Sequence, residues 1–243
     1  MADIATGVFV ALNGIKLGCV LKSVNVSGKG DSLESTALCS TARTFKKGLI
    51  EKNISGEGFF QSSEFTVADV NGLLQSAVTS VNGDFLFLLG RDGTAVGVVA
   101  DMYNLKVAKY DVKNVVAELN MAVFEGQVTE TATAEFHKIG VMLFVNDGVT
   151  ETPVNGTSYD STSGGTGYVI QIHVLDGADA ASVTIQHSAN NSTWADLVVA
   201  ADYDEYTATQ LKSTVTSVNR YVRAVVAATD TANSVAIAMK VGY

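Results

Sequence analysis

The sequence has little proline, cysteine or charge. Of 243 residues, one is proline, two are cysteine and 17% are charged, whereas 22 are glycine and 47% are hydrophobic. Cys19 and Cys39 cannot form a disulfide framework, and the low charge excludes an intrinsically disordered chain. The abundant Val, Thr, Ala and Ser residues favour strands joined by glycine turns over a helical bundle. The predicted fold class is therefore mostly β.

Common catalytic motifs are also missing. The sequence has no G-x-S-x-G elbow, Walker loop, H-E-x-x-H or C-x-x-C motif. The three histidines are His137, His173 and His187. The last two fall in predicted strands, where a structural role is commoner than a catalytic or metal-binding one. We expect no enzyme activity, no cofactor and no metal site.

Net charge and hydropathy limit the partners. The net charge of −9 disfavours tight nucleic-acid binding, because a phosphate backbone would be repelled. The densest apolar stretch, Phe85 to Leu89, has the length of a strand and is too short to span a membrane. The first residues lack the basic region of a secretory signal, which predicts synthesis in a cytoplasm.

Hydrophobic periodicity predicts several strands and one helix. Alternation of apolar and polar residues marks strands at 23–27, 53–57 and 118–123, and further strands are predicted at 115–124 and 127–136. Thr66 and Asp69 fit a capping box, and the spacing of the apolar residues after them predicts a helix over about 66–79, packed on a sheet.

Composition changes after Val145, which predicts a domain boundary. A run rich in Gly, Ser and Thr over 156–165 precedes short, regularly spaced strands typical of a β-sandwich. We predict an N-terminal domain (1–138), a first strand and linker region (139–165) and a C-terminal β-sandwich (166–243) with Trp194 in its core. Between the first two alternating strands, the long stretch from Gly28 to Lys52 mixes charged and apolar residues, which predicts an exposed loop with a partner surface.

Three segments of the N-terminal half carry a resemblance to a known family. They are Asn25 to Leu38 (NVSGKGDSLESTAL), Phe45 to Leu49 (FKKGL) and Ile54 to Phe59 (ISGEGF). This part of the sequence resembles the tail tube (major tail) proteins of long-tailed bacteriophages, or siphophages. In that family the order of elements is a strand, a long loop, a Gly-Leu element, a Ser-Gly-Glu-Gly strand and a helix, and the same order is predicted here. The resemblance covers about residues 1–138.

The C-terminal half resembles the Ig-like accessory β-sandwich domains of phage virion proteins. The matching segments are Ile185 to Ser188, Asn191 to Leu197 and Asn219 to Arg223. Such domains often project from the particle. The resemblance thus implies a tail-tube-type β-sandwich or barrel domain with one helix, followed by a sandwich that decorates the tube.

The resemblance implies a structural role in the virion tail. Family members form hexameric rings that stack into a tube, and this tube is the conduit for DNA during ejection into the host. Their partners are copies of the same chain and other tail proteins, such as the tape measure and terminator proteins, and no membrane is involved. Assembly takes place in the host cytoplasm. The long loop typically reaches the neighbouring ring. That role is carried to Asp31, Glu34, Arg43, Phe45, Lys46 and Lys47.

The polar strand faces have two interpretations. They could face water on an isolated protein or form the wall of a water-filled channel. Under the resemblance, a polar wall with excess negative charge would let DNA pass without holding it. The lumen-facing set predicted on this basis is Asn25, Ser27, Ser55, Glu57, Glu118 and Asn120.

Two other classes of function remain open. One is a two-domain β-rich surface adhesin or carbohydrate-binding protein, which would need an export signal. The other is an enzyme such as a glycosidase with a carboxylate pair, although aromatic residues for sugar subsites are sparse at 8%.

Overall fold

The computed structural model describes most of the chain as β-strands. The described residues are 8–17, 21–34, 45–59, 74–75, 78–79, 84–113, 121–129, 137–149, 152–176, 180–204, 207–228 and 233–242. The prediction of a mostly β fold is confirmed. Leu74, Gln75, Val78 and Thr79 are helical, and the rest of the helix predicted over 66–79 lies outside the described residues. No helix among the described residues has the length and hydropathy to span a bilayer.

The strands follow one another along the chain with few other elements. Their bounds are β1 Phe9–Leu12, β2 Ile15–Lys16, β3 Leu21–Glu34, β4 Phe45–Phe59, β5 Asp84–Gly90, β6 Val99–Lys113, β7 Met121–Val128, β8 His137–Val149, β9 Val154–Asn155, β10 Tyr159–Asp160, β11 Gly165–Asp176, β12 Ala181–Ser188, β13 Ala195–Tyr203, β14 Thr207–Val218, β15 Tyr221–Ala228 and β16 Asn233–Val241.

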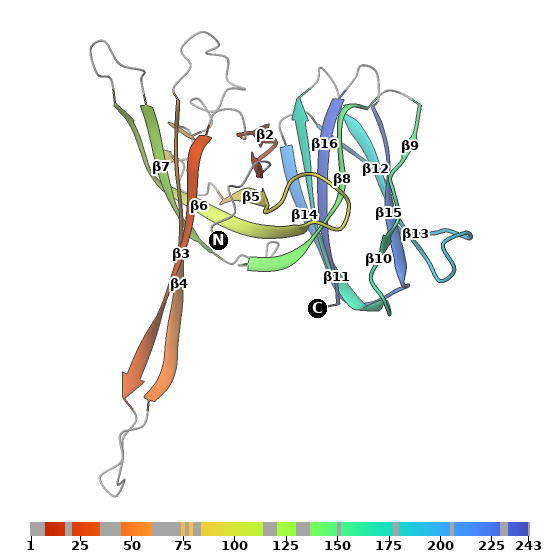
Figure 1. Ribbon diagram of the computed structural model, residues 1–243, viewed down its shortest axis with the longest axis horizontal. Helices are drawn as coiled ribbons and strands as arrows, with labels where there is room; N and C mark the ends of the chain where they lie inside the picture. The colour runs from red at the N-terminus through yellow and green to blue at the C-terminus, as the bar shows by residue number, and fades with distance from the viewer. Residues whose placement is uncertain are drawn as a thin grey trace, which may run out of the picture.

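The strands form two antiparallel sheets (Figure 1). The larger sheet has the order β14-β11-β16-β8-β6-β5-β1-β2, and β7, β4 and β3 branch from β6 in that order. The smaller sheet has the order β10-β15-β12-β13, with β9 also paired to β15. In the C-terminal half the two sheets face each other as a sandwich (Figure 1).

Three groups of buried apolar side chains hold these layers together. One lies between the two sheets of the C-terminal sandwich and includes Ile170, Ile185 and Ile237. A second, around Phe87 and Phe124, lies in the N-terminal half. The third draws residues from β1, β5, β6, β8, β11 and β16, so it joins the two halves.

Strand β8 connects the two halves within one sheet. Val141 of β8 lies opposite Val99 of β6 on one side and opposite Met239 of β16 on the other. The larger sheet is therefore continuous through residues 138–139, where the sequence predicts a domain boundary. The division into domains stays a prediction.

Local sequence explains the tight turn between β1 and β2. Asn13 and Gly14 both have positive φ, 45° and 85°, and they join Leu12 to Ile15, which are paired across the hairpin. A two-residue loop with positive φ at both positions matches the twist of the flanking strands, and Asn-Gly adopts this conformation readily.

The predicted exposed loop over Gly28–Lys52 is wrong at both ends. Residues 28–34 belong to β3 and residues 45–52 to β4, and their pairing continues from Gly28 opposite Lys52 to Glu34 opposite Phe45. Loop composition misleads here because the two strands of a projecting ribbon pair through their backbones and need no buried face. Figure 1 shows the outer part of this β3–β4 hairpin projecting beyond the other strands of the larger sheet.

A candidate assembly surface

Polar side chains cover one face of the branch formed by β3, β4, β7 and β6. Asn25 of β3 lies opposite Ser55 of β4, and Ser55 lies opposite Glu125 of β7. Asn25 and Glu125 are exposed and Ser55 is half-buried. The alternate residues point the other way, and Ile54 and Phe124 among them are buried in the core. We call the exposed side the polar face.

Small side chains leave a hollow in the polar face. Its volume is about 310 Å³, and its lining includes Ser27, Ser55, Ala108 and Gly126. The register of β6 against β7 shifts between Val107 and Lys109, where a bulge makes Ala108 and Lys109 both exposed. The other lining residues are Asn53, Ile54, Glu125 and Gln127.

Charges on the polar face nearly balance. Among the described side chains its carboxylates are Glu51, Glu57, Asp111 and Glu125, and its lysines are Lys29, Lys106 and Lys109. Lys109 Nζ lies 2.9 Å from Asp111 Oδ2 and 3.8 Å from Glu125 Oε1. The face is hydrated and polar, but the net charge of −9 for the whole chain is not concentrated on it.

Strand β3 forms a free edge. Within the described part of the chain it pairs with β4 alone. No described residue pairs with the N–H and C=O groups on its other side, and such groups at a sheet edge can pair with another chain. The exposed Lys22 and Lys29 lie on this strand, and lysine is a common device against uncontrolled edge pairing.

A chain of charged and aromatic side chains lies where the β3–β4 hairpin leaves the sheet. Asp101 accepts hydrogen bonds from Arg91 Nη2 and from His137 Nε2, both at 2.8 Å. Lys52 Nζ lies 2.6 Å from His137 Nδ1. The rings of His137 and Tyr103 stack with their centroids 4.3 Å apart. We call Lys52, Arg91, Asp101, Tyr103 and His137 the hairpin root cluster.

The contacts of the cluster are consistent with one arrangement of donors and acceptors. With Lys52 as an ammonium ion, which has no acceptor, His137 Nδ1 accepts from Lys52 and His137 Nε2 donates to Asp101. Burial alone would raise the pKa of Asp101, but the hydrogen bonds from His137 and Arg91, with the guanidinium charge, lower it to about 2. Burial and the Asp101 charge raise the pKa of Tyr103 to about 12. Burial lowers the pKa of the Lys52 ammonium, against the attraction of Asp101.

Comparison with known proteins finds only distant likenesses. No family model matches the sequence, and no curated protein matches it. The chain is similar to one in the virion of a native gene transfer agent particle, with 12% identity over 54% of this chain and 96% of that chain and a TM-score of 0.43.

Two similar structures extend over more of the chain. The Dit protein of phage SPP1, described as a hub adsorption apparatus, has 10% identity over 96% of this chain and 99% of that one, with a TM-score of 0.37. A chain of the activated phage p2 baseplate has 9% identity over 96% and 98%, with a TM-score of 0.32. At TM-scores below 0.5 these likenesses establish neither the fold nor the function of this chain.

Four of the residues predicted to face a lumen lie together on the polar face. Asn25, Ser27 and Glu57 are exposed there, and Ser55 is half-buried. Glu118 and Asn120 lie outside the described residues. That this face lines a channel stays a prediction.

The residues predicted to contact a neighbouring ring belong to the β3–β4 hairpin. Asp31 and Glu34 lie in β3, and Phe45, Lys46 and Lys47 lie in β4, where Lys46 is opposite Leu33 and Lys47 is opposite Ser32. Arg43 lies outside the described residues. Their contact with another ring also stays a prediction.

Sequence reasoning missed the contribution of β7. Glu125 and Gln127 alternate with the buried Phe124, Gly126 and Val128, which is the signal of a strand with one polar face. The prediction of separate strands at 115–124 and 127–136 is wrong at this point, because β7 runs without a break from Met121 to Val128.

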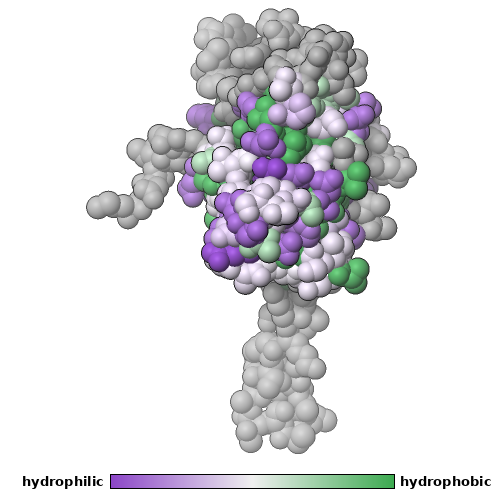
Figure 2. Space-filling model, turned by 90° about the vertical axis from the view of Figure 1, so that its right-hand side faces the viewer, coloured by the Kyte–Doolittle hydropathy of each residue, from purple (hydrophilic) through white to green (hydrophobic). Residues whose placement is uncertain are grey.

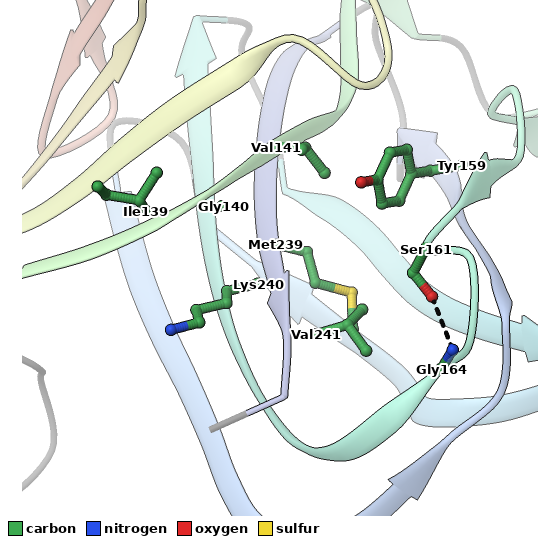
Figure 3. Close-up of a pocket in the computed structure, with 9 residues that line it drawn as sticks. All are labelled: Ile139, Gly140, Val141, Tyr159, Ser161, Gly164, Met239, Lys240 and Val241. Carbon is green, nitrogen blue, oxygen red and sulfur yellow. Dashed lines mark hydrogen bonds between the residues drawn. The ribbon is translucent and has the colours of Figure 1, made fainter.

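A second hollow, of about 250 Å³, lies where β8 diverges from β16 (Figure 3). It is lined by Ile139, Gly140, Val141, Tyr159, Ser161, Gly164, Met239, Lys240 and Val241. Ser161 Oγ accepts a hydrogen bond of 3.2 Å from Gly164 N, and the Lys240 ammonium points away from Ser161 and Tyr159 (Figure 3). The polar groups therefore do not converge on one point.

The prediction that Trp194 lies in the sandwich core is wrong. Trp194 is half-buried, and the guanidinium carbon of Arg223 lies 4.2 Å from its ring centroid. Arg223 Nε and Nη2 both donate to Gln186 Oε1, at 3.0 and 2.8 Å.

On the side of the molecule that faces the viewer in Figure 2, apolar residues occur in small separate groups among hydrophilic ones.

Proposed function

We propose that this chain is a structural protein of a bacteriophage-type virion tail, and specifically a tail tube subunit that assembles with its own copies into stacked hexameric rings. The observation that carries the proposal is the polar face, which spans four hydrogen-bonded strands, is backed by a buried core and ends at the free edge of β3. The resemblance of residues 25–59 to tail tube proteins supports the same assignment.

The free edge supports self-association. A strand edge with unpaired backbone groups is satisfied when another chain adds to it, and closure of a ring removes such edges altogether. If β3 pairs with a sheet edge of the next subunit, the polar faces of successive subunits become one continuous inner wall.

The composition of the polar face suits a conduit for DNA. A wall that binds phosphates through many lysines would hold the duplex, because each neutralised phosphate adds affinity. Here the three lysines are matched by four carboxylates, and Lys109 is engaged by Asp111 and Glu125. The wall would therefore let hydrated DNA pass mainly because its described residues form no basic stripe, and less through net repulsion.

The projecting hairpin supports stacking of rings. On the tip side of Asn53, where the pairing of β4 with β7 ends, no described strand pairs with the hairpin except its own two strands. A two-stranded ribbon is marginally stable alone in water, so a partner surface would stabilise it. We assign that surface to the adjacent ring, with Asp31, Glu34, Arg43, Phe45, Lys46 and Lys47 as the contacts. Tape measure and terminator proteins would be the partners inside and at the end of the tube.

Imaging of the purified chain tests the proposal. Rings or tubes with six-fold symmetry are expected by electron microscopy at high protein concentration, together with a mass of six subunits or more by light scattering. A chain that stays monomeric at millimolar concentration would overturn the assignment. A parallel screen for glycan binding tests the adhesin alternative, which predicts binding by the monomer.

We also propose that residues 166–243 decorate the outside of the tube. Limited proteolysis of assembled tubes should cut the chain in the segment between β8 and β11 and leave the tube intact, because this segment would face solvent on the outside. Loss of the tube on cleavage would instead place the sandwich within the wall.

A further inference from the structure

The hairpin root cluster occupies the point where the β3–β4 hairpin separates from the body. The pairing of β4 with β7 ends at Asn53, which lies opposite Gln127. Lys52, the next residue toward the tip of the hairpin, is therefore the first residue of β4 that does not pair with β7. Lys52 is also the only member of the cluster on the hairpin, since Asp101 and Tyr103 lie on β6, His137 lies on β8 and Arg91 lies just after β5. The Lys52–His137 hydrogen bond therefore joins the root of the hairpin to the body.

We infer that the hairpin root cluster is an interlock that fixes the direction in which the hairpin leaves the body, with His137 as a positioning residue that receives Lys52. Its consequence for assembly, that rings stack only when the hairpin points correctly, rests on the proposed function. The interlock itself is a property of the isolated chain.

The acceptor for Lys52, His137 Nδ1, belongs to a ring that is held in place by two contacts. The His137 ring stacks almost parallel on Tyr103, at an interplanar angle of 8°. Its Nε2–H is donated to Asp101, which is 1% exposed and is itself bound by two guanidinium nitrogens of Arg91. The lone pair of His137 Nδ1 is thus aimed before Lys52 arrives, and less conformational entropy is lost when the bond forms.

Lys52 is suited to the other end of the bond. It lies opposite Gly28, at the pair of hairpin residues next to the body. Its ammonium also lies 5.8 Å from the centroid of the Tyr103 ring, close enough for a cation–π attraction. Lysine can therefore bridge the ribbon and the body, and a methionine of similar length could not.

Hydrogen exchange on the dilute, monomeric full-length chain tests the interlock. Lys52→Met should speed exchange of the hairpin amides at 28–34 and 45–51 about tenfold, because a hydrogen bond to a charged group is lost. Exchange in β5 and β6 should not change. Lys29→Met is the matched control, since Lys29 is an exposed lysine on the same hairpin, opposite Glu51, and it should have little effect.

A double-mutant cycle separates the interlock from general destabilisation. His137→Gln keeps an N–H for Asp101 but offers Lys52 no fixed acceptor, and its effect on hairpin exchange should not add to that of Lys52→Met. Additive effects, or faster exchange throughout the sheet, would overturn the inference. If His137→Gln fails to fold, Lys52→Met decides alone: an effect no larger than that of Lys29→Met also overturns it.

The same variants keep the two proposals apart. If the wild-type chain forms tubes and Lys52→Met does not loosen the hairpin, the interlock is wrong and the tube assignment stands. If Lys52→Met loosens the hairpin but the wild-type chain forms no tubes, the interlock stands and the tube assignment fails.

Discussion

A β-carbon placed on Gly56 would lie 2.2 Å from Cε1 of Phe124. Gly56 and Phe124 are directly opposite each other on β4 and β7, and the Phe124 ring packs against the glycine in the core behind the polar face. The same relationship recurs between Gly126 and Leu105, where the added carbon would lie 2.7 Å from Cδ1. Glycine in these two strands makes room for large core side chains.

Substitution of Gly56 should therefore destabilise the fold. For Gly56→Ala we expect a loss of about 1–3 kcal/mol in the free energy of unfolding, measured by urea denaturation, because Phe124 must leave its position. Gly28→Ala on the paired strand is the control, since its nearest contact would be an ordinary 3.6 Å to the flexible Lys52 side chain. Equal losses for the two variants would contradict the packing argument.

These glycines also show why the sequence predicted the strands better than their packing. Alternation of apolar and polar residues identified the strand faces around Asn25 and Ser55, because one buried face imposes a period of two. Gly126 falls in the gap between the strands predicted at 115–124 and 127–136, and a glycine carries no sign of the Leu105 side chain that fills its place. The contact lies between residues far apart in sequence, and a local pattern cannot record it.

The hairpin root cluster was invisible for the same reason. Lys52, Arg91, Asp101 and His137 come from four separate segments, and none of them falls in a motif. His137 was singled out only as one of three histidines. The pairing of β6 with β8, which places Tyr103 opposite His137, brings the group together.

Asp101 should make stability depend on pH in strongly acidic solution. Its pKa is about 2 in the folded chain, below the value of about 3.9 for an unfolded Asp. A carboxyl group whose pKa is lowered in the folded chain stabilises the fold at pH values above its unfolded pKa. This stabilisation, about 2.6 kcal/mol in total, is lost progressively as the pH falls from about 4 through 2. Urea denaturation at several pH values should show this loss for the wild type and not for Asp101→Asn. Asp84→Asn, which changes an exposed carboxylate on the adjacent strand, should leave the profile unchanged.

His173 should act in a higher pH range. It is fully buried, Gly14 N donates to its Nδ1 at 3.2 Å, and burial lowers its pKa to about 3. An unfolded histidine binds its proton near pH 6.5, so between about pH 6.5 and 3 this residue is protonated in the unfolded state and not in the folded state. Each unit by which the pH falls in this range therefore lowers the free energy of unfolding by up to about 1.4 kcal/mol. In His173→Gln this slope should disappear, although the variant will be less stable at pH 7. Persistence of the slope would assign it to another group.

The pair of Arg223 and Trp194 can be followed by fluorescence, because Trp194 is the only tryptophan. Arg223→Met should shift the emission spectrum of the folded chain and lower the free energy of unfolding by about 0.5–1 kcal/mol, as expected for a cation–π pair that is partly accessible to solvent. Arg220→Met is the matched control: Arg220 lies over Tyr221 and is paired with Asp160, so it should leave the tryptophan emission unchanged. An unaltered spectrum in Arg223→Met would mean that the stacking does not persist in solution.

The polar face should release DNA only if it contains few lysines. Ser27 and Gln127 both line its hollow, and Ser27→Lys with Gln127→Lys would add two cations per subunit to a face that now has three lysines against four carboxylates.

Assembled tubes of this double variant should retain DNA at low salt and release it as salt rises, because each phosphate contact adds about 0.9 to the slope of log affinity against log salt concentration. Val215→Lys with Val199→Lys is the control, since both valines are strongly exposed on the C-terminal sandwich, at 83% and 73%, and they add the same charge there. If the control tubes retain DNA as strongly as the double variant, the polar face does not line the path of the DNA.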